Sequence, residues 1–317
     1  MHVRRCSPAF RRHGFAVLCG CLCAVLGQGC SALGQRSAVR LMGQIAEAGM
    51  PAYLREADLG LAEPALAASV KLTEALLETA PDDRRLLLQA VQGVAGYTYA
   101  FVETQLEEAR GHDLDQVEVH TQRAQRLYQR GLHYGLRLLS QYDPVLLQAT
   151  ALPLETLTLH LRQLHREAVP ALLWTSFCWG GFLNLERTAL ETATALPLFQ
   201  AMLTRLLELD ETYFYGLPHL LQAVHEASFA AALGGQPAQA QDHFARAYAL
   251  SQGHLLLVPL LEAQYYAVQV QDRALFAQRL QQVLAAPETL FPEQALLNAV
   301  AKRRAALLLR RIDELFV

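Results

Sequence analysis

The sequence is short of the motifs on which most enzymes depend. It contains no Gly-x-Ser-x-Gly nucleophile motif, no glycine-rich phosphate loop and no His-Glu-x-x-His zinc motif. Two histidine pairs, His160 with His165 and His219 with His225, lack the four-residue spacing that places two metal ligands on one helix face. We therefore expect a protein that is not an enzyme, with no catalytic residue, no metal site and no cofactor.

Cysteine is almost absent beyond the first 30 residues. Five of the six cysteines lie between Cys6 and Cys30, and the rest of the chain holds only Cys178. If Cys30 is acylated, no intramolecular disulfide can form. A lone cysteine in an apolar, aromatic segment is typical of a small buried hydrophobe, so we expect Cys178 in the core.

The first 29 residues have the pattern of an export signal. The apolar stretch Phe15–Leu26 has the length of a secretory signal and is shorter than the roughly 20 residues needed to span a bilayer. The basic head in front of it contains Arg4, Arg5, Arg11 and Arg12.

The segment Gly27–Ser31 resembles a lipobox, whose cysteine becomes diacylated and forms the mature N-terminus. Gly27 departs from the usual pattern, which has Leu or Val three residues before the cysteine. The alternative Leu18–Cys21 fits that pattern better but leaves an apolar segment of only about six residues. We therefore predict a lipoprotein signal peptide over residues 1–29 and lipidation of Cys30, with Cys21 as the alternative.

Removing the signal changes the charge of the chain. The first 29 residues contain four of the 27 basic residues and none of the 30 acidic ones, so the net charge moves from −3 to −7. An acidic body argues against a nucleic-acid partner. The densest basic cluster is interleaved with Ala and Leu, and we expect it on a solvated helix face. Its members are Lys302, Arg303, Arg304, Arg310 and Arg311.

The mature chain is expected to be attached to a membrane only through its lipid. No further run of 18 apolar residues is apparent after the signal. Residues 30–40 form a short tether and residues 41–317 a single domain. Ser31 follows the cysteine, and lipoproteins that lack Asp there are generally sent to the outer membrane, so we predict a periplasmic protein anchored there.

The body has the composition of helices. Ala, Leu, Gln, Glu and Arg dominate, and Gln271–Leu284 places its apolar residues at helical spacing. The residues Tyr97, Tyr99 and Phe101 alternate with a period of two, as in a strand. We favour a helix over Val91–Glu108 because helix formers continue on both sides and Tyr97 and Phe101 are four residues apart.

Short breaks divide the body into helices of about 12 to 25 residues. Acidic pairs at Asp82–Asp83, Glu107–Glu108 and Asp210–Glu211 are expected to be helix caps or solvated faces. The breaks are predicted at residues 81–83, 111–113, 142–144, 152–153, 210–211, 234–235, 253 and 287.

Residues 231–253 have the spacing of a tetratricopeptide (TPR) repeat of about 34 residues. Ala240, Phe244 and Ala247 take the positions of its second helix, and Ser228 and Ala231 take small-residue positions of its first, where close helix packing needs small side chains. Further degenerate repeats are suggested at Leu203–Asp210 and Leu72–Pro81. We predict an all-α body of stacked antiparallel helical hairpins with degenerate TPR-like repeats; the alternative is an unrelated helical bundle.

The chain as a whole resembles the TatT-like lipoproteins, TPR-like components associated with tripartite ATP-independent periplasmic (TRAP) transporters. The order and spacing of many short motifs carry the resemblance. They are Pro51–Leu54, Gly96–Phe101, Val169–Trp174, Trp179–Gly180, Gly234–Gly235, His243–Ala247, Leu297–Asn298, Arg304–Ala305 and Ile312–Phe316.

The resemblance implies a periplasmic protein, a homotrimer, that pairs with the solute-binding protein of a transporter and has a passage or cavity through each subunit. Aromatic residues crowd several helix ends and could line such a cavity for a small hydrophobic or organic-acid ligand. Trp174 and Trp179 point about 140° apart on a helix, so we expect one of them at the cavity. The candidate lining residues are Trp174, Trp179, Tyr97, Phe101, Tyr213, His219 and Tyr265.

Two functions are consistent with these features. In the first, the protein is a transport accessory whose cavity binds or passes an apolar organic ligand. In the second, it is a TPR-type scaffold for envelope proteins that binds no small molecule. A cavity inside the fold would favour the first, and a filled interior would favour the second.

Overall fold

The computed structural model describes residues 37–185, 190–228 and 235–316. The predicted signal peptide and Cys30 lie outside these ranges. Within them, every regular element is a helix and no strand is present, which confirms the predicted all-α class.

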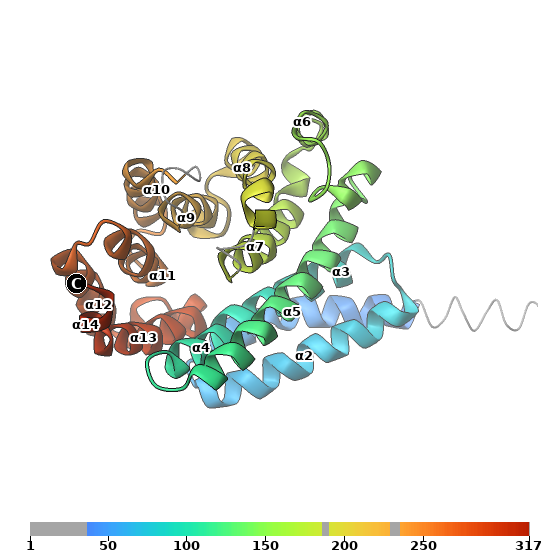
Figure 1. Cartoon of the computed structure of the whole chain (residues 1–317). Coiled ribbons are helices and arrows are strands. Elements are labelled where there is room, and N and C mark those ends of the chain that lie inside the picture. Colours follow the sequence, from blue (N-terminus) through green and yellow to red (C-terminus); the bar gives the residue numbers. More distant parts are fainter. Residues whose placement is uncertain (1–36, 186–189, 229–234, 317) are drawn as a thin grey trace, which may run out of the picture.

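The N-terminal part is a set of long helices packed side by side. In Figure 1, α2, α3 and α5 form the lower part of the molecule, and α3 packs against both α2 and α5. The elements are a first helix over residues 37–54, α2 (Leu59–Thr79), α3 (Arg84–Tyr97), η1 (Thr98–Val102), α4 (Glu103–Ala109) and α5 (Leu114–Leu139).

The middle of the chain is built around one apolar helix, α7. It packs against α3 and α5 on one side and against α8 and α9 on the other. The elements are η2 (Pro144–Gln148), α6 (Leu154–Arg162), η3 (Arg166–Ala168), α7 (Val169–Leu185), α8 (Leu190–Asp210) and α9 (Tyr213–Ser228).

The C-terminal part brings the chain back to its first helices. Helix α13 packs against α2 and α4, far away in sequence, so the arc of helices closes around an interior that α7 and α9 face (Figure 1). The elements are α10 (Pro237–Leu250), α11 (Leu257–Leu261), η5 (Glu262–Ala267), α12 (Arg273–Ala285), η6 (Glu288–Leu290), η7 (Pro292–Gln294), α13 (Ala295–Arg310) and α14 (Ile312–Leu315).

Helix ends fall where short polar segments predict them. The Asp83 carboxylate accepts hydrogen bonds from the backbone N–H groups of Arg85 and Leu86, and Asp113 caps α5 in the same way. An aspartate at this position satisfies backbone donors that the first helical turn leaves unpaired. These contacts confirm the predicted breaks before α3 and α5.

The hairpin of α9 and α10 contains the residues from which a TPR-like repeat is inferred. Ala240, Phe244 and Ala247 are all buried, and α10 packs closely on α9. Ser228 is the last residue of α9, and Ala231 lies outside the described residues. Helical pairing is thus confirmed at this hairpin, and the repeat itself remains an interpretation of the sequence.

Helix α7 is apolar on all its faces. The segment Arg166–Leu185 reaches the length and mean hydropathy of a membrane span, although, as expected, it contains no run of 18 apolar residues. Just over half of this stretch is buried inside the protein (56%), because four helices surround it. A helix that is hydrophobic all round is typical of the core of a large domain.

Two charged residues expected on solvated faces are buried, so that expectation is wrong for them. Arg304 is completely buried in α13, and Glu107 is only 4% exposed in α4. Both belong to ion pairs between the N-terminal and C-terminal parts, which sequence patterns do not reveal. Cys178 is buried as expected, and burial raises the pKa of its thiol.

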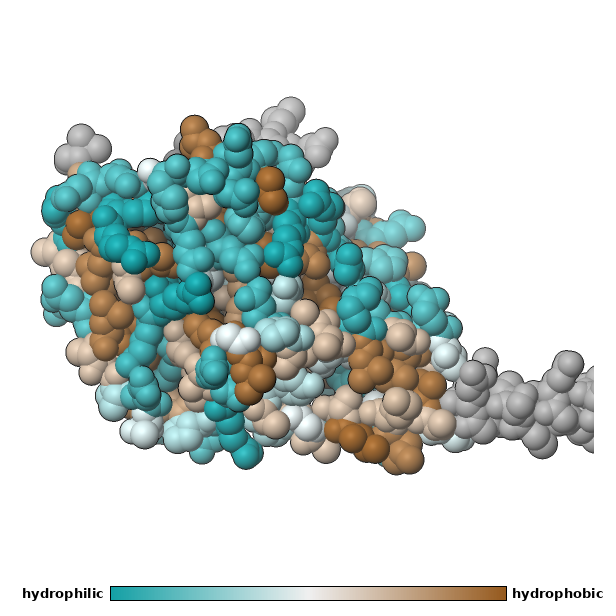
Figure 2. Space-filling model, turned by 90° about the horizontal axis from the view of Figure 1, so that it is seen from below, coloured by the Kyte–Doolittle hydropathy of each residue, from teal (hydrophilic) through white to brown (hydrophobic). Residues whose placement is uncertain are grey.

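Apolar side chains also reach the surface near the start of the described chain. Figure 2 shows them gathered on the lower face, next to the grey N-terminal trace. The exposed large apolar residues of the first helix and α2 are Leu41, Met42, Ile45, Leu61 and Leu72.

Candidate functional site

Three cavities, each partly open, adjoin one another through shared wall residues. The central one, here the inner chamber, has a volume of about 110 Å³ and a mainly apolar wall that includes Phe177, Leu217, Leu220 and Leu261. One water molecule needs roughly 10–15 Å³ on this measure, so the chamber has room for several waters or a small organic group. Helices α7 and α9 provide most of its wall.

The second cavity, here the N-terminal cavity, lies between the first helix, α2 and α3. It has a volume of about 120 Å³ and is lined by Met50, Tyr53, Leu66 and Thr73, among others. The third, here the polar cavity, has a volume of about 280 Å³ and is lined by Glu107, Arg110, Thr121 and Gln264, among others.

The inner chamber meets the N-terminal cavity at an aromatic neck. Four residues line both spaces: Gly96, Trp174, Phe214 and Leu297. The rings of Trp174 and Phe214 meet edge to face with centroids 5.7 Å apart. The two cavities thus adjoin at these four residues.

A strained turn holds Phe214 in the neck. Phe214, Tyr215 and Gly216 all have positive φ, at 46°, 60° and 84°. Only glycine adopts this left-handed region without strain, so two consecutive aromatic residues there need support from their surroundings. Trp174 contacts the ring of Phe214, and Phe291 contacts the ring of Tyr215 at 4.9 Å.

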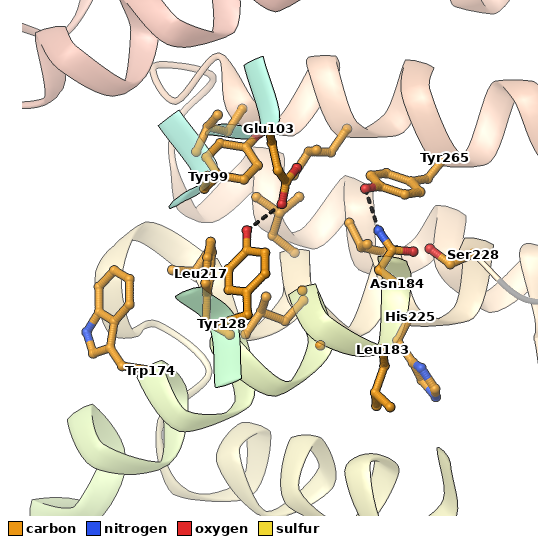
Figure 3. A pocket seen from close by; sticks show the side chains of 18 of the residues that line it. Tyr99, Glu103, Tyr128, Trp174, Leu183, Asn184, Leu217, His225, Ser228 and Tyr265 are labelled. Atoms are coloured by element: carbon orange, nitrogen blue, oxygen red, sulfur yellow. Dashed lines mark hydrogen bonds between the residues drawn. The ribbon is translucent and has the colours of Figure 1, made fainter. Parts of the chain in front are cut away.

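The inner chamber meets the polar cavity at a second boundary, here the polar junction, formed by Glu103, Asn184 and Tyr265, which line both spaces. The Asn184 side-chain amide donates a hydrogen bond of 2.6 Å to the Tyr265 hydroxyl (Figure 3). This bond joins the end of α7 to η5 across the boundary.

Two π-helical turns shape this end of the chamber. The η1 turn contains Tyr99, and the η5 turn contains Tyr265. Both tyrosines line the inner chamber, although they come from opposite halves of the chain. Single π-turns inside α-helices occur frequently at functional sites.

The carboxylate of Glu103 is held in place by two partners. It accepts a hydrogen bond from the hydroxyl of Tyr128 (Figure 3), and Nη1 of Arg304 lies 3.3 Å from its Oε2. Arg304 also donates to Gln264 and lies over the ring of Tyr99, 4.5 Å from the ring centroid. The pair therefore joins α4, α5, η5 and α13 behind the chamber wall.

Burial has opposite effects on the groups of this cluster. It opposes the charge of Arg304, yet the neighbouring Tyr99 and Glu103 keep the pKa of the guanidinium above its ordinary value. Burial raises the pKa of the Tyr99 hydroxyl, which has no hydrogen-bond partner among the described residues. Burial also raises the pKa of Tyr128, as does its bond to Glu103. Both tyrosines are thus neutral at neutral pH.

His225 contributes a neutral polar side chain to the chamber wall. It is 8% exposed, and burial lowers its pKa to about 4. Its ring packs edge to face on Phe199, with centroids 5.2 Å apart. At neutral pH it therefore adds no positive charge to the chamber.

The structure places the seven predicted lining residues in different surroundings. Trp174 lines the inner chamber and the N-terminal cavity, and Tyr265 lines the inner chamber and the polar cavity. Trp179 packs against Phe199 and lines none of the three.

The remaining four lie outside the cavity walls. The ring of Tyr97 contacts Phe101 at 5.6 Å, Phe101 is buried, and Tyr213 is half-buried beside Phe214. His219 lies between α9 and α10, where its ring nitrogens contact His243 and Glu211.

Several chamber residues are not among the sequence-predicted candidates. They are Tyr99, Glu103, Tyr128 and Asn184. The sequence holds a signal for one of them, since Tyr99 stands between the predicted Tyr97 and Phe101 in an unusual aromatic alternation. The wide η1 turn directs Tyr99 to the chamber, and no local pattern predicts that turn.

A comparison with known families identifies the chain. No curated protein sequence matches it significantly. The family described as the TRAP transporter T-component matches residues 55–316. This range contains every lining residue of the inner chamber and of the polar cavity, and those of the N-terminal cavity that do not come from the first helix. The match includes most of the described body and every residue of the polar junction and the neck. The chain therefore belongs to the TRAP transporter T-component family.

Proposed function

We propose that this protein is a periplasmic lipoprotein that binds a small apolar ligand in its inner chamber and passes it along the three cavities to or from a solute-binding protein. Membership of a transporter-component family supports an accessory role in TRAP transport. Lipidation at Cys30, attachment to the outer membrane, pairing with the solute-binding protein and assembly as a homotrimer belong to this proposal. They rest on the sequence pattern and on the family resemblance.

The observation that carries the ligand proposal is the sharing of wall residues between neighbouring cavities. Side chains of the neck line the inner chamber and the N-terminal cavity, and those of the polar junction line the inner chamber and the polar cavity. A ligand that displaced Phe214 and Tyr265 would find a continuous route. Side-chain rearrangements of this kind take far less time than unfolding.

The apolar wall determines the kind of ligand. Ligand pockets are mostly apolar with a few polar groups that fix orientation, and the inner chamber has this character. A scaffold that binds only proteins has no use for an apolar interior space, and filling it would stabilise the fold.

Binding of a neutral apolar fluorophore, N-phenyl-1-naphthylamine, tests this proposal. We expect saturable binding to the purified protein at one site per chain. The substitution Gly96→Leu puts a side chain into the neck and should weaken binding at least tenfold while the protein stays folded, because the space next to Gly96 is open. Absence of saturable binding to the wild-type protein would favour the scaffold alternative.

A further inference from the structure

We infer that the inner chamber selects uncharged amphiphiles, such as a primary amide or an alcohol with an apolar tail, and excludes carboxylates. This inference rests on the proposed function, since it concerns the ligand of the same chamber. The sequence leaves two ligand classes open, hydrophobic molecules and organic acids. The inference favours the uncharged, hydrophobic class over the acids.

The charges of the wall carry the inference. Among the described residues that line the inner chamber, Glu103 is the one charged side chain, and it is negative. The described wall of the N-terminal cavity contains no charged side chain. His225, the one histidine of these walls, is neutral at neutral pH.

A carboxylate in the inner chamber would be an anion without a free cation, because Arg110 of the adjoining polar cavity is already paired with Glu107. Such a charge is strongly disfavoured unless a counter-ion and hydrogen bonds compensate for the lost water. The nearest buried cation, Arg304, is already paired with Glu103 and lies behind the wall, completely buried. Glu103 keeps the guanidinium of Arg304 paired, so this cation is not free to compensate a second carboxylate.

A cationic amine gains little from the same wall. The carboxylate of Glu103 already interacts with Arg304 and Tyr128, so its negative charge is compensated within the protein. An uncharged ligand avoids both problems.

The polar junction gives an uncharged head group its partners. Asn184 and Tyr265 bring amide and hydroxyl groups to this end of the chamber, and the buried hydroxyl of Tyr99 lacks a partner among the described residues. The opposite end is the apolar neck at Trp174 and Phe214. The ligand is thus oriented with its head at the polar junction and its tail at the neck.

Three probes with the same tail test the selection: octanamide, octanoate and octylamine, titrated into the purified protein at pH 7.5 by calorimetry. We expect octanamide to bind at least about 30-fold more tightly than octanoate, because burial of an unpaired anion is so unfavourable. Octylamine should also bind more weakly than octanamide.

A pair of carboxylate variants identifies the excluding group. Glu103→Gln removes the negative charge at the wall and leaves Arg304 without its counter-ion, so octanoate should bind at least about fivefold more tightly to this variant. Glu108→Gln is the matched control, because Glu108 pairs with Arg303 away from the chamber and does not line it. Thermal melting of both variants checks that they are folded.

The outcomes separate this inference from the proposed function. Octanoate binding as tightly as octanamide would overturn the inference and leave an apolar-ligand function standing. Equal octanoate affinity in wild type and Glu103→Gln would overturn the role of Glu103. Failure of all three probes and of the neutral fluorophore would contradict the proposed function itself.

Discussion

The two ends of the inner chamber are built in different ways. The neck consists of aromatic rings held by a strained backbone turn, and no ion pair holds its four residues. The polar junction rests on the ion pair between the partly buried Glu103 and the completely buried Arg304, and on the hydrogen bond from Asn184 to Tyr265. The neck is therefore held by packing alone, whereas the polar junction is fixed by an ion pair, and on the proposed route a ligand passes the junction by breaking only the hydrogen bond between Asn184 and Tyr265.

The largest expected effect comes from breaking the ion pair at the polar junction. Arg304→Met removes a completely buried cation and leaves the partly buried carboxylate of Glu103 without its partner, which should lower the free energy of unfolding by about 3–5 kcal/mol in urea titration. Arg303→Met is the matched control, because Arg303 and Glu108 form a partly exposed pair worth at most about 1 kcal/mol. Similar stability of the two variants would show that the polar junction is not fixed as described.

Acidification should weaken the chamber wall through His225. Its pKa is about 4 in the folded protein against 6.5 for the ordinary side chain, so the unfolded chain takes up the proton first as the pH falls. The free energy of unfolding should thus decrease between pH 6.5 and pH 4, by about 3 kcal/mol from this group.

The substitution His225→Gln removes this contribution. We expect a shallower loss of stability with falling pH in the variant than in the wild type, measured by urea unfolding at a series of pH values. His112→Gln, in the exposed turn between α4 and α5, is the control and should keep the wild-type slope. Parallel curves for His225→Gln and the wild type would rule out the neutral buried histidine.

Alanine substitutions of the two tryptophans compare the packing of the neck with that of the ordinary core. Trp179→Ala removes a ring packed on all sides and should destabilise the protein by about 3–5 kcal/mol. Trp174→Ala should cost less, about 2 kcal/mol, because one side of this ring already faces cavity space. Equal losses in thermal melting would mean that Trp174 is a core residue like Trp179.

The smallest expected change in the free energy of unfolding comes from substituting a glycine at the neck. A Cβ atom at Gly96 meets nothing within 4 Å, so Gly96→Ala should raise the free energy of unfolding by about 0.5–1 kcal/mol through helix propensity. A Cβ at Gly135 would lie 2.4 Å from Oγ1 of Thr175, and Gly135→Ala should destabilise by about 1–3 kcal/mol. A destabilising Gly96→Ala would show that the neck is already filled.

Local signals explain what the sequence predicts well. Caps such as Asp83 and breakers such as Pro144 act within a few residues, so helix boundaries follow from neighbours in the chain. The burial of Ala240, Phe244 and Ala247 follows from their spacing on one helix face. The helical class is predictable for these reasons, whereas the family is recognised from the order and spacing of short motifs along the whole body.

Long-range contacts explain what the sequence predicts poorly. Arg304 pairs with Glu103, which is 201 positions away in the sequence, and no local pattern around either residue predicts this ion pair. A weak signal does exist, because Arg304 shares its helix face with the buried Ala301 and Leu308. The η1 turn is a π-turn between two α-helical segments, and no local residue pattern specifies it, so the direction of Tyr99 is not predictable from its neighbours.

The orientation of a bound amphiphile tests the contrast between the two ends most directly. Trp174 and Trp179 are the only tryptophans, so Trp179→Phe leaves Trp174 at the neck as a single fluorescent reporter. Bromine quenches a nearby indole, and 8-bromooctanamide and 2-bromooctanamide carry it at opposite ends. We predict that the 8-bromo compound, whose tail lies at the neck, quenches Trp174 more strongly at equal occupancy. Stronger quenching by the 2-bromo compound, or none by either at saturation, would contradict the account.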